Sequence, residues 1–269
     1  MTIAISIKVN DGVVLAADSA STIIGQDNKG RLGVINVYNN ANKIFNLCYD
    51  EPVGVITWGS GSIGQESIST LVKDFRNQLD LNDGYEIKNV AKEFTKFIWE
   101  KYDEEFKEWP EKPNLGFMVV GYSDNRPLAE EWKIDIQQGI CEKPKQVRKE
   151  NEIGITWNGE TEAINRIYLG YGGNLIRILE SEKIDQEIIE RIISKHHDSY
   201  LSMLLPAMPI QDAIDLAKFL VETTTQFSRF VPGAPTVGGP IEIAAITKHE
   251  GFKWVNRKHY YNKDLNPIW

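Results

Sequence analysis

Thr2 is the residue whose type and position offer the clearest chemistry in this sequence. If Met1 is removed, Thr2 becomes the first residue, and its small side chain suits the aminopeptidase that trims initiator methionine. An N-terminal threonine carries a hydroxyl nucleophile and an amine base on adjacent atoms, which is a recognised way to activate a weak nucleophile. The free α-amine has an ordinary pKa of about 7.7–8.0, so part of it is neutral near pH 7. Many proteins have threonine second, so the surrounding sequence must decide whether this chemistry is used.

A glycine-rich segment at residues 59–64, Gly-Ser-Gly-Ser-Ile-Gly, is a second candidate. It fits the G-x-G-x-x-G dinucleotide fingerprint, follows an apolar strand pattern and opens a helical pattern. A second helical pattern, however, occupies the stretch where the next parallel strand and its ribose-binding acid should lie. We therefore interpret residues 59–64 as a tight strand-to-helix turn, with nucleotide binding as the alternative. In either case small residues leave backbone N–H groups accessible to a negatively charged ligand atom.

The four histidines do not form a metal-binding pattern. His196 and His197 are neighbours in a polar helical stretch, where they point in different directions, so we interpret them as part of a solvated face. His249 and His259 lie near the end of the chain without the spacing of a zinc site. No metal ion or organic cofactor is therefore expected.

Composition and charge exclude some classes of binding partner and indicate the cellular compartment of the protein. The net charge is −8, from 38 acidic and 30 basic residues, which argues against nucleic acid or an anionic membrane surface as the main partner. The chain shows neither a signal peptide nor an apolar run long enough to cross a bilayer. Cys48 and Cys141 follow no metal-binding or redox spacing. These features predict a soluble protein of the reducing cytoplasm.

Apolar periodicity predicts a single α+β domain over residues 1–269. Strands are expected at 2–9, 13–17, 43–48, 53–58, 115–122, 128–136, 153–157, 241–247 and 252–256, and helices at 63–80, 85–108, 160–169 and 210–227. Residues 25–42 indicate a long loop or hairpin, 142–151 a solvated connection, and about 171–207 an extra helical segment. Because strands and helices come in groups, we expect antiparallel sheets with helices on their outer faces.

Several stretches together resemble the proteasome β-type subunits of the N-terminal-nucleophile (Ntn) hydrolases. The resemblance lies in TIAISIKVNDGVVLAADS at 2–19, Lys-Ile-Phe at 43–45, VGVITWGSGSIG at 53–64, MPIQDAIDLA at 208–217 and IEIAAIT at 241–247. It frames almost the whole chain, and it implies a four-layer α-β-β-α sandwich of two antiparallel sheets.

The same resemblance assigns roles to individual residues. Thr2 matches the family's nucleophile, Asp18 its carboxylate, Lys43 the lysine beside the hydroxyl, and Gly59 the backbone donor of the oxyanion hole. Where the family has a serine that assists the amine, this chain has Asn158. The loop between Asp18 and Lys43 is longer than in the family. The family's second Asp–Ser pair has no clear match in residues 233–239.

The function that the resemblance implies is threonine-type hydrolysis of peptides or small amides, within a homo-oligomeric ring. It also raises an ATP-dependent unfoldase as a partner. Two alternatives stay open: a structural ring subunit without turnover, and a nucleotide-binding protein that uses residues 59–64.

Overall fold

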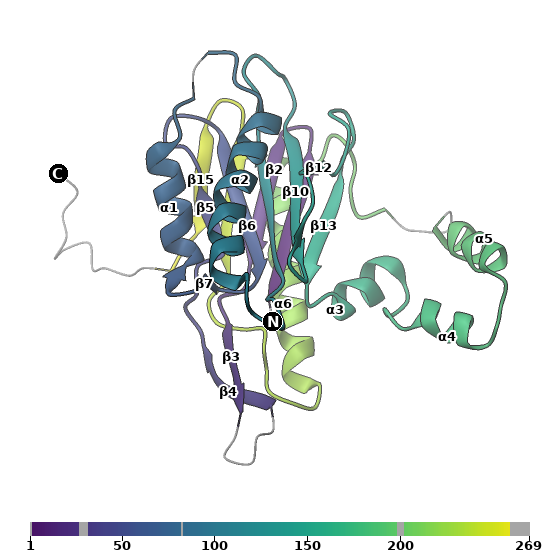
Figure 1. The fold of residues 1–269 in the computed structure, drawn as a ribbon. Coiled ribbons are helices and arrows are strands. Elements are labelled where there is room, and N and C mark those ends of the chain that lie inside the picture. Colours follow the sequence, from purple (N-terminus) through teal and green to yellow (C-terminus); the bar gives the residue numbers. More distant parts are fainter. Residues whose placement is uncertain (1, 27–31, 82, 198–201, 259–269) are drawn as a thin grey trace.

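Two antiparallel sheets form the centre of the computed structural model, which describes residues 2–26, 32–81, 83–197 and 202–258 (Figure 1). The first sheet has five strands, in the spatial order β13 (Gly154–Gly159), β1 (Ile3–Val9), β2 (Gly12–Ala17), β14 (Glu242–Thr247) and β15 (Gly251–Asn256). All neighbouring strands in this sheet run antiparallel. The strands predicted at 2–9 and 13–17 are confirmed, and they form a hairpin with Val9 opposite Gly12 at its turn.

The second sheet has six strands. Five follow the order β11 (Ile140–Cys141), β10 (Glu130–Gln137), β9 (Leu115–Gly121), β6 (Val53–Gly59) and β5 (Ile44–Asn46), and β12 (Lys145–Gln146) pairs with β10. Two small hairpins lie outside these sheets: β3 (Ser21–Gln26) with β4 (Leu32–Tyr38), and β7 (Ser62–Ile63) with β8 (Glu66–Ser67). Figure 1 shows β3 and β4 projecting from the body near the N-terminus.

Strand β1 shows why this sequence places a strand at the centre of the molecule. Its odd-numbered residues, Ile3, Ile5 and Ile7, belong to a hydrophobic cluster that also contains side chains of α6 (Ile210–Phe230). Ala4, on the other face, belongs to a cluster built from both sheets. Every residue of β1 is buried because both of its faces are covered.

Helices α1 (Ile68–Gln78) and α2 (Ile87–Phe106) contribute to a third hydrophobic cluster, with the second sheet. In α2 the residues Val90, Phe94, Ile98 and Tyr102 are buried at intervals of four, the spacing that puts side chains on one helix face. The predictions of antiparallel sheets and of helices packed on them are therefore confirmed.

The expected extra helical segment lies at the periphery. It contains α4 (Leu175–Ser181) and α5 (Gln186–His197), whereas the helix expected at 160–169 is observed as α3 (Glu162–Ile164) followed by a short π-helix (Asn165–Leu169). Figure 1 shows α4 and α5 standing away from the sheets. Ile178 on α4 and Ile192 on α5 are 55% and 47% exposed, because no element of the body covers them. That this segment belongs to one domain with the rest stays a prediction.

Two local predictions were wrong. The first helix begins at Ile68 rather than at residue 63, because β7 and β8 form a hairpin in front of it and Ser67 caps its N-terminus by accepting a hydrogen bond from Thr70 N at 3.1 Å. The stretch 142–151 is not simply a solvated connection, since it contains β12 and the largely buried Arg148, which is paired with Glu131. Among the described residues, no helix is long and apolar enough to span a membrane.

Candidate active site

Asp18 is the fully buried centre of the candidate site, immediately after β2. Its Oδ1 accepts hydrogen bonds from Lys43 Nζ at 2.6 Å and from Ile3 N at 3.0 Å. Its Oδ2 accepts bonds from Ala20 N and Gly238 N, each at 3.0 Å. The carboxylate therefore ties together the start of β1, the end of β2, the loop before β14 and the lysine before β5.

Lys43 immediately precedes β5, and its backbone is fixed by a 2.9 Å hydrogen bond from Thr57 N to Lys43 O. Its side chain is 6% exposed and forms an ion pair with Asp18. Burial lowers the pKa of the Lys43 ammonium, while the negative charge of Asp18 opposes that change. The site thus holds an ammonium group of weakened basicity next to the start of the chain.

Thr2 is buried directly before β1, and its backbone is held on both sides. Glu160 N donates a 2.7 Å hydrogen bond to Thr2 O, and the following residue, Ile3, is bound to Asp18. Gly159 passes so close that a Cβ there would lie 1.8 Å from Thr2 O, and its φ is +93°. Glycine is therefore required at position 159 for β13 to hold Thr2 in place. Met1, whose removal would free the Thr2 amine, lies outside the described residues.

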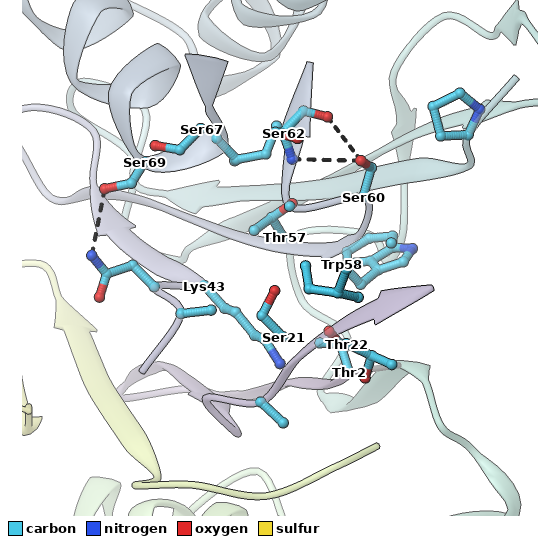
Figure 2. A pocket seen from close by; sticks show the side chains of 18 of the residues that line it. Thr2, Ser21, Thr22, Lys43, Thr57, Trp58, Ser60, Ser62, Ser67 and Ser69 are labelled. Carbon is cyan, nitrogen blue, oxygen red and sulfur yellow. Dashed lines mark hydrogen bonds between the residues drawn. The ribbon is translucent and has the colours of Figure 1, made fainter. Parts of the chain in front are cut away.

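A cavity of about 800 Å³ opens next to Thr2 and Lys43 (Figure 2). This volume is in the range of small-molecule and peptide-binding pockets. Hydroxyl groups dominate the lining side chains: Thr2, Ser21, Thr22, Thr57, Ser60, Ser62, Ser67 and Ser69. Among the described residues that line this cavity, Lys43 carries the only formal charge. The cavity is thus polar and positively charged at its Thr2 end.

Gly59, at the end of β6, forms part of the cavity wall. Its φ is +88°, and a Cβ there would lie 2.4 Å from Asn114 O. The next residue, Ser60, donates a 2.9 Å backbone hydrogen bond to the same oxygen. The backbone at residue 59 is therefore held in a conformation that only glycine adopts without strain.

The geometry of residues 59–64 does not favour nucleotide binding. The N-terminus of α1 is capped by Ser67 rather than by the glycines, so these glycines do not present the helix N-terminus to a phosphate. A carboxylate also lies against this turn, since a Cβ on Gly64 would be 2.7 Å from Glu105 Oε2. An acidic group at this position would repel a phosphate.

The structure thus brings Thr2, Lys43 and Gly59 to one cavity and places Asp18 behind Lys43. It does not bring Asn158 there. Asn158 is half-buried on β13 opposite Ala4 and is not among the residues that line the cavity.

The sequence interpretation missed two buried charged residues next to Asp18. Glu242 begins β14 opposite Ala17, and Lys258 follows β15. Their side chains form an ion pair at 2.7 Å, with exposed fractions of 2% and 6%. No local motif could have revealed them, because both lie more than two hundred positions from Asp18 in the sequence. The pairing of β14 with β2 brings this part of the chain to Asp18.

The histidines lie away from this site. His196 is not simply solvated, since its Nε2 lies 2.9 Å from Leu169 O, within hydrogen-bonding distance. The side chain of His197 and the whole of His259 lie outside the described residues. The part of the chain that the structure describes contains no cluster of three or more His, Cys, Asp or Glu side chains suited to a metal ion.

No protein-family model and no curated protein sequence matches this chain. Solved structures of Anbu proteins are similar to it in fold. A Gly-1 mutant of Anbu from Hyphomicrobium sp. strain MC1 is 15% identical with a TM-score of 0.57, covering 96% of this chain and 86% of that one. Anbu from Yersinia bercovieri, described as an ancestral beta-subunit, is 14% identical with a TM-score of 0.56 and coverages of 96% and 89%. The protein in a helical assembly of the Anbu complex from Pseudomonas aeruginosa is 14% identical, with a TM-score of 0.57 and coverages of 98% and 90%.

These matches correct the assignment of the chain to the proteasome β-type subunits of the Ntn hydrolases. The structural neighbours are Anbu proteins, one of them described as an ancestral beta-subunit, and at 14–15% identity the likeness concerns the fold alone. The stretches that suggested the assignment form the β1–β2 hairpin, β5, the segment from β6 to β7, the first part of α6, and β14. Such stretches preserve backbone geometry, so they can be shared by proteins of the same fold without indicating one family.

Proposed function

We propose that the chain is a threonine-type amide hydrolase whose nucleophile is Thr2 after loss of Met1. The observation that supports this proposal best is the placement of Thr2 and Lys43 in one cavity, with Lys43 paired to Asp18 at 2.6 Å. A buried hydroxyl next to a fixed ammonium, at the end of a polar cavity, is the arrangement that activation of a threonine requires.

In the proposed reaction, Thr2 Oγ forms a bond to the carbonyl carbon of the substrate amide, and the hydroxyl proton moves to the α-amine of Thr2. The tetrahedral intermediate breaks its carbon–nitrogen bond, and the proton passes from the α-amine to the departing amine. An ester on Thr2 remains. Water then attacks the ester with the same amine as base, and release of the carboxylic acid returns the proton to Oγ.

The neighbouring groups have separate roles in this proposal. The Lys43 ammonium lowers the pKa of the Thr2 α-amine by charge repulsion and stabilises negative charge that develops on Oγ. Asp18 holds Lys43 in place. The backbone N–H of Gly59 binds the oxyanion, and one such donor contributes about 3–4 kcal/mol to stabilisation of the transition state. Asn158 has no role in this proposal, because it does not line the cavity.

The lining of the cavity indicates the class of substrate. Hydroxyl groups and the amides of Asn40 and Asn42 can bind the polar backbone of a peptide or a small amide. The described lining contains no carboxylate that would attract a basic side chain. We therefore propose peptides or small amides with neutral or acidic groups as substrates.

We further infer a four-layer order, α-β-β-α, and association of the chain with copies of itself. The layer order is supported by the three hydrophobic clusters, which lie between α1, α2 and the second sheet, between the sheets, and between the first sheet and α6. Self-association is supported by the fold likeness to a protein solved in a helical assembly. Light scattering of the purified chain tests it, and a monomer at every concentration would contradict it.

Intact-mass spectrometry after treatment with an epoxyketone or a β-lactone tests the catalytic proposal. We expect a chain that lacks Met1 and gains the mass of one probe molecule. Thr2→Ala should keep the fold and lose the labelling, whereas Ser21→Ala, which removes another hydroxyl of the same cavity, should keep it. A folded wild-type chain that retains Met1, or that lacks Met1 and is not labelled, would refute the proposal and favour a structural subunit.

A further inference from the structure

A second buried ion pair lies directly behind Asp18 and Lys43. The Lys258 ammonium makes three contacts: it donates to Ser19 Oγ at 2.7 Å and to Ala41 O at 2.8 Å, and it lies 2.7 Å from Glu242 Oε2. A lysine ammonium has three N–H donors, and two of them are used in hydrogen bonds to Ser19 Oγ and Ala41 O, while the Glu242 carboxylate balances its charge. These partners distinguish Lys258 from a surface lysine that is buried by chance.

The three contacts of Lys258 fall on segments that position the proposed catalytic groups. Ser19 follows Asp18, and Ala41 lies two residues before Lys43. Ser19 and Ala41 are also joined by a 2.9 Å bond from Ala41 N to Ser19 O. Lys258 therefore closes a clamp around the two chain segments whose separation sets the geometry of the Asp18–Lys43 pair.

We propose that Lys258 is a positioning residue of the Thr2 site, which clamps the segments of Asp18 and Lys43 and balances the charge around that pair together with Glu242. This inference rests on the proposed function of Thr2. Lys258 itself does not line the cavity, so it acts through Asp18 and Lys43 rather than on a substrate.

The charged groups around Lys43 have opposite effects on the pKa of its ammonium. The charged side chains that act on it are Asp18, Lys258 and Glu242. Lys258 lowers the pKa of Lys43 by repulsion between like charges, whereas Asp18 and Glu242 raise it. Loss of Lys258 alone leaves an excess of negative charge, and loss of both Lys258 and Glu242 restores the balance.

The first test measures the pKa of Lys43 by NMR titration, in a Thr2→Ala background so that no turnover is needed. We expect Lys258→Met to raise this pKa, Lys258→Arg to leave it close to its original value, and the double variant Lys258→Met/Glu242→Gln to bring it back. The double variant carries no unpaired buried charge, so it keeps the test decisive if Lys258→Met does not fold. An unchanged Lys43 pKa in every folded variant would overturn the proposed charge balance.

The second test measures the labelling rate of Thr2 by a β-lactone as a function of pH. Lys258→Met should slow labelling by about 10- to 100-fold, since small misplacements at a reacting centre have effects of this size. It should also move the rising limb of the pH profile to higher pH, because a lost positive charge favours protonation of the α-amine. Lys258→Arg should recover most of the rate, and Lys253→Met, at an exposed lysine of β15, should change nothing.

The two proposals can fail separately. If wild-type Thr2 is not labelled, the hydrolase proposal fails, while the Lys43 titration still reports on Lys258. If wild-type Thr2 is labelled but the Lys258→Met profile keeps both its rate and its pH limb, the positioning role of Lys258 is refuted and the hydrolase proposal stands.

Discussion

The two ends of β1 carry two buried clusters of charged residues, and only one of them has the features of a reactive site. At the first end, Asp18, Lys43, Glu242 and Lys258 surround the start of the strand. Further along the strand, roughly 13 Å from Thr2, Ser6 Oγ donates to Glu131 Oε1 at 2.6 Å, and Arg148 is paired with the second oxygen of Glu131. Both clusters contain carboxylates that are almost completely removed from solvent.

The clusters differ in what adjoins them. The first lies behind a cavity of about 800 Å³ and next to a residue that can become a chain terminus. At the second, Arg148 Nη2 donates to Thr156 Oγ1 at 2.7 Å, and Lys8 Nζ donates to Lys149 O and Glu150 O at 3.1 and 2.8 Å. None of these described residues lines the cavity next to Thr2. Buried charge pairs alone therefore do not indicate function, because an accessible cavity and a reactive group must accompany them.

The largest expected effect comes from removing the cation of each cluster in turn. Lys43→Met and Arg148→Met each leave a buried carboxylate unpaired, so each should lower the free energy of unfolding by about 3–5 kcal/mol. Only Lys43→Met should also slow β-lactone labelling of Thr2, by about 100- to 1,000-fold, the size expected when a group that stabilises developing negative charge is lost. Urea unfolding and labelling rates of the folded fraction measure the two effects.

The claim that only the cluster around Asp18 acts on Thr2 would be contradicted if Arg148→Met slowed labelling as much as Lys43→Met does. That result would mean that both ends of β1 act on the reaction, or that loss of stability alone explains the slower labelling. Equal labelling of Lys43→Met and wild type would instead exclude Lys43 from the mechanism.

A smaller effect is expected from Gly59→Ala, for which Gly84→Ala is a matched control. Both glycines have a positive φ, +88° and +83°, but a Cβ at 59 would lie 2.4 Å from Asn114 O, and a Cβ at 84 would meet nothing within 4 Å. Each alanine should therefore add about 1–2 kcal/mol of backbone strain. Gly59→Ala should in addition slow labelling about 100-fold, by moving the oxyanion donor. Comparable labelling of the two variants would remove Gly59 from the site.

The smallest expected effect is a loss of folding stability at alkaline pH, caused by Tyr122, which lies away from Thr2. Tyr122 is 3% exposed, and burial raises its pKa from 10.0 to about 12. The folded state therefore keeps a proton that the unfolded state loses, so stability from this group is present below pH 10 and is lost between pH 10 and 12. The full contribution is about 2–3 kcal/mol. Tyr122→Phe should flatten this loss in pH-dependent urea unfolding, without a change in labelling at pH 7. An equally steep loss in Tyr122→Phe would show that other groups control alkaline unfolding.

Local sequence patterns were sufficient for much of the fold. Intervals of four in α2 predicted which face of that helix is buried, because the helix must cover its apolar side. Alternation in β1 predicted a strand, but it did not predict that the face carrying Ser6 and Lys8 is buried as well. The patterns were less reliable where pairing partners are distant. The hairpin of β7 and β8 delays the start of α1, and Arg148 is buried only because Glu131 on β10 lies next to it.

The residues of the candidate site also differ in whether the sequence could predict them. Thr2 could be proposed from its type and position, whereas Asp18, Lys43 and Gly59 were assigned through the resemblance of short stretches to a known family. Asn158 was proposed as the counterpart of a serine in the resembled family, but in the structure it does not line the cavity. Lys258 and Glu242 could not be proposed, because they pair with each other and Lys258 donates to Ser19, a residue separated from both by most of the chain.

Residues that are neighbours along the chain were enough to predict the main strands and helices, and the composition gave the overall negative charge. Which charged side chains surround Thr2 became visible only once the strands were paired. The reason is physical: periodicity and turns depend on neighbours along the chain, whereas desolvation and ion pairing depend on which distant segments the sheets bring together.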